Sequence, residues 1–571
     1  MSEPATLPGC LVRHARERPG AVALRKKDFG RWREWTWSEY EAWVARVAAG
    51  LRECGLGPGD RIAILSENRP EWLIGDLAAQ AIGAIVVGVY PTSPAAEVDY
   101  LLRHSGAKLL IAEDEEQVDK ALEVRAGLPD LADVFVVDPR GVDATEARRW
   151  EELERAEPLD LTAAAADLHP EDTAIIVYTS GTTGPPKGAM LSHANMLYAA
   201  RIFRDAYGTR PDDEVLSYLP LCHIAERLFS VLGAVEAGYV VNFGAGGESF
   251  PADMREVQPT VFLGVPRVWE KMLATVEVRM ADASRLKRWA WRLALASGGV
   301  VGNLLAFRAL REKLGLLRVR AAISGAAPIA PQVLEFFARI GVRVREGYGQ
   351  TEGTAVATAT PEGGIRIGTV GTAVPGVELR TADDGEILVR SPGVFKGYYR
   401  DDDATRATVD EDGWLHTGDV GELDGDGYLT ITDRMKDIII TAGGKNVSPS
   451  EIENKLKVSP YVREAIVIGD RRKYLSALIG IELDTVADWA TRRGVPFTTY
   501  GDLASKDPVR ELIGEWVEQV NDDLAQVERV KKFSLLRKEL DHEDGQLTAT
   551  QKVKRAAISE EFADEVEALY R

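Results

Sequence analysis

Cysteine is scarce in this chain, whose 571 residues include only Cys10, Cys54 and Cys222. Three scattered cysteines provide neither a disulfide framework nor a zinc-binding spacing. The seven histidines show no metal-ligand spacing either. These absences favour a reducing compartment, and we expect a cytoplasmic protein.

Long apolar runs and an excess of positive charge are also missing. The most hydrophobic stretch, residues 81–90, is far shorter than the roughly 20 residues of a membrane-spanning helix. The amino terminus lacks the basic start and apolar core of a signal peptide. A formal charge of −20 argues against general nucleic-acid binding. An anionic substrate must therefore meet a local positive site, while peripheral contact with the inner face of a membrane is compatible with this composition.

The chain does contain a repeated alternation of short buried strands and longer helical patterns. Its length predicts at least two domains. Apolar runs at 61–65, 84–90 and 108–114, and another from Thr173, predict buried parallel strands of an α/β fold. Residues 268–316 instead predict long amphipathic helices. Their cluster of Trp and Arg at 285–292 suits anionic lipid, although a solvated helix face is the commoner explanation.

The carboxy-terminal part has a different pattern. After Gly385, short β segments are separated by Asp-Gly turns, as in hairpins. A charged run at 433–437 follows, and then an α+β pattern. We expect a large domain of several subdomains over 1–432, with mixed and parallel sheets flanked by helices, and a small α+β domain over 433–571.

The densest chemical signal is a loop that follows the strand from Thr173. Hydroxyls, glycine amides and one lysine can together hold phosphate oxygens. The lysine is not preceded by Gly and followed by Ser or Thr, so the loop is not a Walker A motif. Its candidate phosphate-binding residues are Thr179, Ser180, Gly181, Thr182, Thr183, Gly184 and Lys187.

This loop, YTSGTTGPPKG, resembles the phosphate-binding signature of the adenylate-forming superfamily, which includes acyl-CoA synthetases, luciferases and peptide-synthetase adenylation domains. Six further matches follow in the family's order: LPLCHIAER (219–227), SGAAP (324–328), EGYGQTEG (346–353), GWLHTGD (413–419), ITDRMKDIIITAGGKN (431–446) and LTATQKVKR (547–555). Because they keep this order over most of the chain, chance similarity is a poor explanation.

The resemblance implies a nucleotide site. Tyr348 would offer its ring to adenine, Thr351 a hydroxyl near the phosphates, and Asp419 its two oxygens to the ribose, with Arg434 in support. Glu352 and Thr179 would hold Mg²⁺. The remaining nucleotide-binding positions implied by the motifs are Gly325, Ala326, Glu346, Gly347 and Gly349.

The resemblance also implies catalytic and moving parts. Lys552 would stabilise charge as a carboxylate attacks the α-phosphate, with Lys554 and Arg555 beside it as a solvated basic tail. His223 would steer the carboxylate or close the acyl pocket against water. Lys436 matches the hinge about which the small domain rotates. Gly443 and Gly444 would let the pantetheine arm of coenzyme A pass close to the backbone.

The implied activity is ATP- and Mg²⁺-dependent conversion of a carboxylic acid to acyl-AMP and then to a coenzyme A thioester. LPLCHIAER, VPRVWEK (265–271) and the helical insertion before SGAAP resemble bacterial long-chain fatty acyl-CoA synthetases, so we expect a medium-to-long fatty acid. The alternatives are an acyl-AMP ligase that loads a carrier protein in trans, a ligase for an aryl or terpenoid acid, and an inactive nucleotide- or lipid-binding relative. A monomer and a homodimer are both compatible with the sequence.

Overall fold

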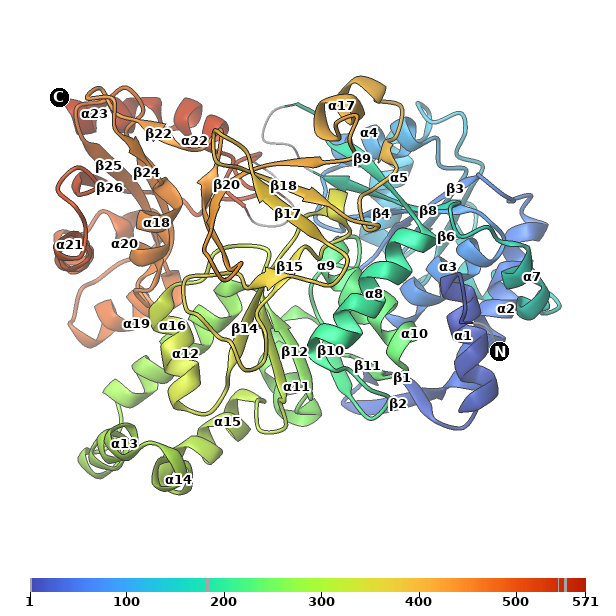
Figure 1. Cartoon of the computed structure of the whole chain (residues 1–571), viewed down its shortest axis with the longest axis horizontal. Helices are drawn as coiled ribbons and strands as arrows, with labels where there is room; N and C mark the ends of the chain where they lie inside the picture. The colour runs from blue at the N-terminus through green and yellow to red at the C-terminus, as the bar shows by residue number, and fades with distance from the viewer. Residues whose placement is uncertain (1–2, 180–183, 543, 549–551) are drawn as a thin grey trace.

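The structure, a computed structural model, describes residues 3–179, 184–542, 544–548 and 552–571. It consists of a large main lobe and a smaller C-terminal lobe, which we define as residues 435–571 and which lies at the left of Figure 1. No helix in the described ranges is long and apolar enough to cross a membrane.

An eight-stranded sheet forms the centre of the main lobe. Its strand order is β19 (Gly397–Tyr398), β9 (Lys187–Ser192), β8 (Thr173–Thr179), β4 (Ile85–Val89), β3 (Arg61–Leu65), β5 (Leu109–Ala112), β6 (Asp133–Val136) and β7 (Arg148–Arg149). The strands β8, β4, β3, β5, β6 and β7 run parallel. The parallel strands expected at 61–65, 84–90, 108–114 and from Thr173 are therefore confirmed.

Both faces of this sheet are covered because its strands are apolar on both sides. One face packs against α1 (Leu7–Glu17), α2 (Trp37–Glu53), α3 (Pro70–Ala81) and α8 (His193–Tyr207). The other packs against α4 (Ala95–Ser105) and α5 (Glu115–Arg125). Alternate residues of β3 contribute to the two cores, with Ile62 and Ile64 on one side and Ala63 and Leu65 on the other.

Three further sheets complete the main lobe. The first comprises β10 (Glu214–Ser217), β11 (Val240–Phe243), β1 (Val22–Asp28) and β2 (Arg31–Thr36). The second comprises β12 (Val261–Gly264), β13 (Ala321–Ser324), β14 (Val344–Tyr348), β15 (Thr358–Ala359) and β16 (Thr372–Ala373). The third is antiparallel and comprises β17 (Glu378–Thr381), β18 (Glu386–Arg390), β20 (Leu415–Leu423) and β21 (Leu429–Arg434).

A helical excursion joins the parallel strands β12 and β13, as the pattern over 268–316 predicts. It comprises α12 (Pro266–Ala281), α13 (Arg285–Ser297), α14 (Gly299–Gly302), the π-helical turn η3 (Asn303–Phe307) and α15 (Arg308–Leu314). Figure 1 shows α13 and α14 at the lower left, projecting from the rest of the main lobe.

The C-terminal lobe has its own core. Its three-stranded sheet comprises β24 (Val462–Ile468), β25 (Leu475–Ile481) and β26 (Val530–Leu535). One face packs against α18 (Pro449–Lys457), α19 (Leu483–Arg492) and α21 (Asp507–Asp522), and the other against α22 (Arg555–Glu561) and α23 (Ala563–Tyr570). The strand β21 of the main lobe continues to Arg434, two residues beyond the expected boundary at 432, and the C-terminal core begins at Ile439.

Candidate active site

Tyr348, Asp419 and Arg434 come together from two sheets. Asp419 and Arg434 are directly opposed residues of the antiparallel pair β20 and β21. The Arg434 Nε lies 3.5 Å from Asp419 Oδ1. Tyr348, the last residue of β14, donates its hydroxyl to Asp419 Oδ2 at 2.7 Å. Burial raises the pKa of Asp419, while the Tyr348 hydrogen bond and the charges of Arg434 and Lys552 oppose that rise.

The turn around Tyr348 requires close backbone approaches. A Cβ on Gly325, just after β13, would lie 3.1 Å from the Gly347 carbonyl oxygen. A Cβ on Gly349 would lie 2.3 Å from the Ala355 carbonyl oxygen, which no side chain permits. Ala326 has a φ of 68°, in the left-handed region. Burial raises the pKa of the Glu346 carboxyl to about 8, so this side chain is largely protonated at neutral pH.

Thr351 and Glu352 lie in a single 3₁₀ turn, η4 (Thr351–Gly353), directly after this loop. Thr351 is buried. Tyr398 donates its hydroxyl to Glu352 Oε1 at 2.6 Å, and the Phe395 N–H donates to the Glu352 carbonyl at 2.8 Å. Among the described residues, Glu352 Oε2 has no protein partner, so this oxygen suits a hard cation.

The protein alone offers too few ligands for such a cation. Within the described ranges, no three His, Cys, Asp or Glu side chains are grouped as metal ligands would be. A Mg²⁺ ion at Glu352 would therefore take its other ligands from nucleotide oxygens and water, as Mg²⁺ commonly does in enzymes that act on nucleotides. Glu352 therefore fits a Mg²⁺ ion that is bound jointly by the protein, a nucleotide and water.

The candidate phosphate-binding loop lies between the antiparallel strands β8 and β9. Thr179 ends β8 and is paired in register with Lys187, which begins β9. The Lys187 Nζ lies 5.2 Å from the centroid of the Tyr398 ring. Tyr398 therefore contacts Lys187 through its ring and Glu352 through its hydroxyl. Gly184 has a φ of 90°. Ser180, Gly181, Thr182 and Thr183 lie outside the described residues.

His223 is the N-cap of the short helix α9 (Ile224–Glu226) within LPLCHIAER. Its Nδ1 accepts the Ala225 N–H at 3.2 Å. Burial and the positive charge of Lys552 lower the pKa of His223 to about 4, so the imidazole is neutral at physiological pH. Because Nδ1 is an acceptor, the proton of the neutral ring is on Nε2, which remains a donor.

Buried charges hold the His223 segment in place. Arg227 pairs with Asp76 of α3, and both side chains are fully buried. The Arg227 guanidinium also lies 4.8 Å from the centroid of the Trp72 ring. Glu226 accepts hydrogen bonds from Ser217 at 2.7 Å and from Ser230, and burial raises its pKa to about 8. These contacts anchor the helix start at which His223 sits.

Lys552 reaches the main lobe from a loop of the C-terminal lobe. Its N–H donates to Thr548 Oγ1 at 3.0 Å, and its carbonyl accepts the Thr548 N–H at 2.7 Å. The residue keeps access to solvent. The surrounding protein and the nearby Arg434 charge lower the pKa of Lys552 to about 8, whereas Asp419 raises it. Lys552 therefore acts electrostatically on Asp419 and His223 of the other lobe.

The expected solvated tail after Lys552 is wrong for Arg555. The Arg555 guanidinium forms two hydrogen bonds to the Glu453 carboxylate, at 2.7 and 2.6 Å, and one to the Val467 carbonyl at 3.2 Å. The reason is that α22 starts at Arg555 and packs against the sheet of the C-terminal lobe.

Lys436 follows β21 and lies close enough to the candidate site to be affected by its charges. Burial and the charge of Arg434 lower the pKa of Lys436, Lys187 adds to that effect, and Asp419 opposes it. Gly443 and Gly444 lie in the exposed turn between β22 (Ile439–Ile440) and β23 (Asn446–Val447), where the Gly444 N–H donates to the Thr441 carbonyl. The structure thus brings Tyr348, Asp419 and Arg434 into contact. The charge of Lys552 reaches both Asp419 and His223, whereas among the described residues no hydrogen bond or ion pair joins the glycine pair to this group.

Sequence reasoning missed Tyr398, which contacts both Glu352 and Lys187. It lies outside the quoted motifs, in GVFKGYYR, where two adjacent tyrosines follow a glycine. The only signal was an aromatic pair after a turn, which is too common to identify a site residue.

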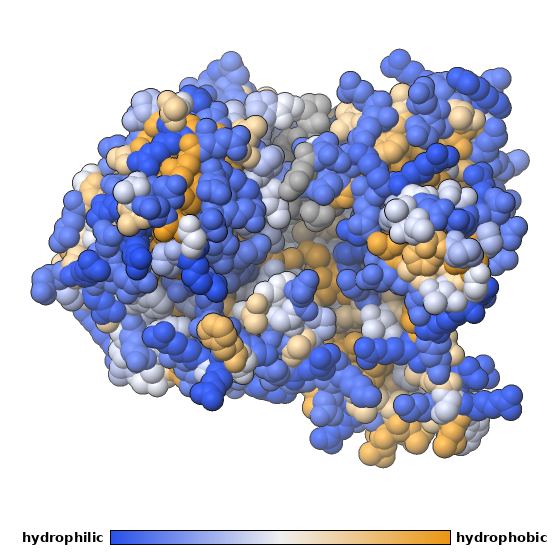
Figure 2. Space-filling model, turned by 180° about the vertical axis from the view of Figure 1, so that it is seen from behind, coloured by the Kyte–Doolittle hydropathy of each residue, from blue (hydrophilic) through white to orange (hydrophobic). Residues whose placement is uncertain are grey.

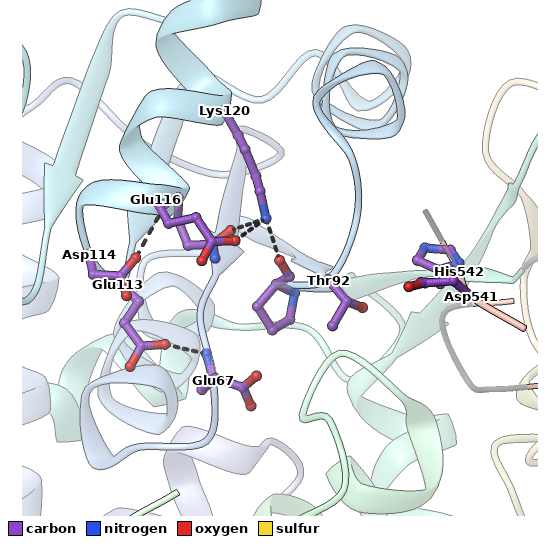
Figure 3. A pocket seen from close by; sticks show the side chains of 10 residues that line it. Glu67, Thr92, Glu113, Asp114, Glu116, Lys120, Asp541 and His542 are labelled. Carbon is purple, nitrogen blue, oxygen red and sulfur yellow. Dashed lines mark hydrogen bonds and ion pairs between the residues drawn. The ribbon is translucent and has the colours of Figure 1, made fainter. Parts of the chain in front are cut away.

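An acidic cavity of about 330 Å³ lies between the lobes, at the carboxyl ends of β3, β4 and β5. Figure 3 shows Glu67, Glu113, Asp114 and Glu116 on one side and His542 of the C-terminal lobe on the other. The His542 Nε2 lies 3.4 Å from Glu97 of α4. This concentration of carboxylates repels polyphosphates, so the cavity is not the nucleotide site.

Comparisons with known proteins identify the family of this chain. The profile of "AMP-binding enzyme" matches residues 11–399, and that of "AMP-binding enzyme C-terminal domain" matches residues 436–571. The chain is 36% identical over 580 residues to "Long-chain-fatty-acid--CoA ligase FadD15" of Mycobacterium bovis, covering 98% of this chain and 96% of the relative.

Two solved structures illustrate the likeness of fold. ATP-bound MatB from Rhodopseudomonas palustris has a TM-score of 0.71 and 26% identity, covering 98% of this chain and 99% of that chain. The anthranilate CoA ligase AuaEII in complex with anthranoyl-AMP has a TM-score of 0.78 and 22% identity, covering 100% and 99%. The fold and site together define an adenylate-forming enzyme. The chain belongs to the AMP-binding enzyme family, as its resemblance predicts.

Proposed function

We propose that this protein activates a medium-to-long-chain fatty acid with ATP and Mg²⁺ to acyl-AMP, then forms the coenzyme A thioester and releases AMP and pyrophosphate. The observation that carries the proposal is the contact of Tyr348 and Arg434 with Asp419, next to the charge of Lys552. A cation from the C-terminal lobe acts on Asp419 and His223 of the main lobe, in the neighbourhood of Tyr348 and Arg434.

Each group has a role that its geometry supports. The Asp419 carboxylate, held by Tyr348 and Arg434, can accept hydrogen bonds from ribose hydroxyls. The Lys552 ammonium offsets the negative charge that develops as the carboxylate attacks the α-phosphorus and pyrophosphate departs. His223 can donate its Nε2–H to the substrate carboxylate. Bound at Glu352, Mg²⁺ supplies charge neutralisation of the phosphates.

The second half-reaction requires different surroundings. We propose that the C-terminal lobe rotates about the junction at Lys436, which withdraws Lys552 and presents Gly443 and Gly444 to the pantetheine arm. The division of the chain near residues 432–436 supports this, because each lobe has its own hydrophobic core. An exposed glycine turn can approach a ligand closely.

The fatty-acid class rests on similarity. The relative FadD15 is named for long-chain fatty acids and matches nearly the full length of the chain. We propose a cytoplasmic enzyme that works at the inner face of the membrane, as a monomer or homodimer.

The test is an incubation of purified protein with ATP, Mg²⁺ and a panel of acids from acetate to oleate plus aryl acids, with and without coenzyme A. AMP and thioester are followed by mass spectrometry. We expect coenzyme A-dependent thioester formation that peaks with long chains and is lost in Lys552→Ala but retained in Lys554→Ala. Acyl-AMP without thioester would indicate transfer to a carrier protein, a peak with aryl acids would reassign the substrate, and no product with any acid would contradict the proposal.

A further inference from the structure

An unusually apolar surface projects from the helical excursion between β12 and β13. We call it the apolar ridge and define it as Leu286, Trp289, Leu293, Val300, Val301, Leu304 and Leu305. These are seven of the thirteen exposed large hydrophobic side chains in the described part of the chain, and Leu304, Val300 and Leu286 are 80%, 77% and 73% exposed. Figure 2 shows a corresponding hydrophobic patch at the lower right. Such clustering marks an interaction surface, whereas isolated apolar residues do not.

Packing within the chain does not explain the ridge, because a different apolar face of the same helices packs against the core of the main lobe. Trp291 of α13 packs with its ring edge-on to Phe307, with the centroids 5.9 Å apart. Ala294 and Phe307 are buried in the core beneath. The residues Leu286, Trp289 and Leu293, at spacings of three and four, share a different face of α13 that points to solvent.

Positive charge borders the ridge. Arg285, Arg288 and Arg292 recur at the same spacing and form a stripe along the neighbouring side of α13. Lys287 lies on the other flank of α13, and Arg308 begins α15. All five side chains belong to exposed residues, and none of them forms an ion pair with a described residue. Residues 285–308 contain no Asp or Glu, although the whole chain carries a formal charge of −20.

We propose that the apolar ridge and its basic border dock the protein on an anionic lipid bilayer. Apolar side chains, a tryptophan and unpaired arginines on one helix are the features of a segment that lies in the membrane interface. A symmetric dimer through the same surface is disfavoured, because an isologous contact brings the same cations of the two copies together. Anionic headgroups, in contrast, complement them.

Docking would give the enzyme direct access to acid dissolved in the bilayer, an inference that rests on the proposed function. Long-chain acids and their thioesters are amphiphiles, and the acids partition into bilayers because of their buried methylene groups. A ligase held at the bilayer surface by α13 would take its acid from the lipid phase. The docking itself requires neither ATP nor acid, so it can be measured separately.

The experiment is co-sedimentation of the full chain with vesicles of phosphatidylcholine alone and of phosphatidylcholine mixed with phosphatidylglycerol, without ATP or fatty acid. One variant replaces the ridge (Leu286→Gln, Trp289→Gln, Leu293→Gln), and a second replaces the border (Arg285→Gln, Lys287→Gln, Arg292→Gln). Arg288 is kept because its guanidinium donates to the Ala281 carbonyl. Phe29→Gln with Val527→Gln is the matched control, since both residues are exposed elsewhere.

We expect binding to the anionic vesicles that weakens at high salt. At about fivefold per basic side chain, the border variant should bind on the order of 100-fold more weakly. The ridge variant should lose a comparable factor, on the order of 100-fold, through lost apolar burial. The control should bind as the unaltered protein does, and all variants should keep ATP–pyrophosphate exchange with a short soluble acid.

Several results would overturn the proposal. These are no binding to anionic vesicles, equal binding by all variants, or a wild-type dimer that becomes monomeric in the ridge variant without any vesicle binding. If vesicles are bound but no acid is activated, the docking stands and the proposed ligase function fails instead.

Discussion

The Tyr348 hydroxyl donates a 2.7 Å hydrogen bond to Asp419 Oδ2, joining the end of β14 to the antiparallel sheet that leads into the C-terminal lobe. The family resemblance predicts that the Tyr348 ring stacks on adenine, and the structure shows that its hydroxyl also binds Asp419. The same residue fixes the carboxylate proposed to accept the ribose hydroxyls, so under the proposed function base and ribose recognition would be coupled through one side chain.

Replacing this hydroxyl should weaken nucleotide binding selectively. In Tyr348→Phe the ring remains, but Asp419 loses a hydrogen bond to a charged acceptor, which is typically worth about 1.5–3 kcal/mol. We expect the KM for ATP to rise at least about 10-fold, with a smaller effect on the KM for the acid. Steady-state kinetics with each substrate varied in turn would measure this, and equal changes in both constants would contradict the coupling.

The Lys552 pKa of about 8 predicts a basic limb in the pH dependence of adenylation. The useful form carries the proton, so it is present below pH 8 and disappears as the pH rises through that value. We therefore expect kcat/KM for ATP to fall above about pH 8. The corresponding fall in kcat should occur at higher pH, because the phosphates of bound ATP raise the pKa of Lys552 by favouring its charged form.

Lys552→Arg provides the control for this assignment. Arginine stays protonated throughout the accessible range, so whatever activity the variant retains should show no basic limb. A limb that is unchanged in Lys552→Arg would assign the titration to a different group.

Tyr398 should tune the proposed Mg²⁺ site through Glu352. Its hydroxyl donates a 2.6 Å hydrogen bond to Glu352 Oε1, which fixes the orientation of the carboxylate and so of Oε2. In Tyr398→Phe we expect the half-saturating Mg²⁺ concentration to rise about 10-fold, as for other lost outer-shell contacts. Glu352→Gln, which removes the charge, should have the larger effect. The readout is a Mg²⁺ titration of ATP–pyrophosphate exchange, and equal Mg²⁺ dependence in all three proteins would show that Glu352 is not a ligand.

The sequence predicts local features of this fold far better than distant contacts. Strands such as β3 and β8 are recognisable because they are apolar on both faces, which only a covered parallel sheet requires. The motifs likewise single out Asp419 and Lys552 as candidate site residues, which stays a prediction. The pairing of Arg227 with Asp76, 151 residues apart, leaves no local pattern, and neither does the contact of Tyr398 with Glu352. The pairing of Arg555 with Glu453, 102 residues away, leaves no local pattern for the same reason.

The buried pair of Arg227 and Asp76 should be essential for stability. Arg227→Met keeps much of the volume but leaves the fully buried Asp76 carboxylate unpaired, which costs about 3–5 kcal/mol of unfolding free energy. The matched control is Arg366→Met, because Arg366 pairs with Asp424 and Asp426 at the surface, where solvent screens the charges and the loss in stability should be much smaller. Urea unfolding measures both, and equal losses would contradict the role of burial.

Gly349 should be the least replaceable residue of the turn proposed to bind adenine. An added Cβ would lie 2.3 Å from the Ala355 carbonyl oxygen, and both partners are backbone, so the loop that carries Thr351 and Glu352 must shift. A displacement of about 1 Å can cost on the order of 100-fold in rate, and we expect a loss of that size in kcat for Gly349→Ala. Gly353→Ala is the matched control four residues away, because its added Cβ would meet only Leu415 Cδ2 at an ordinary 3.6 Å. Single-turnover formation of acyl-AMP isolates this step, and similar rates in the two variants would mean that the turn adapts without moving Glu352.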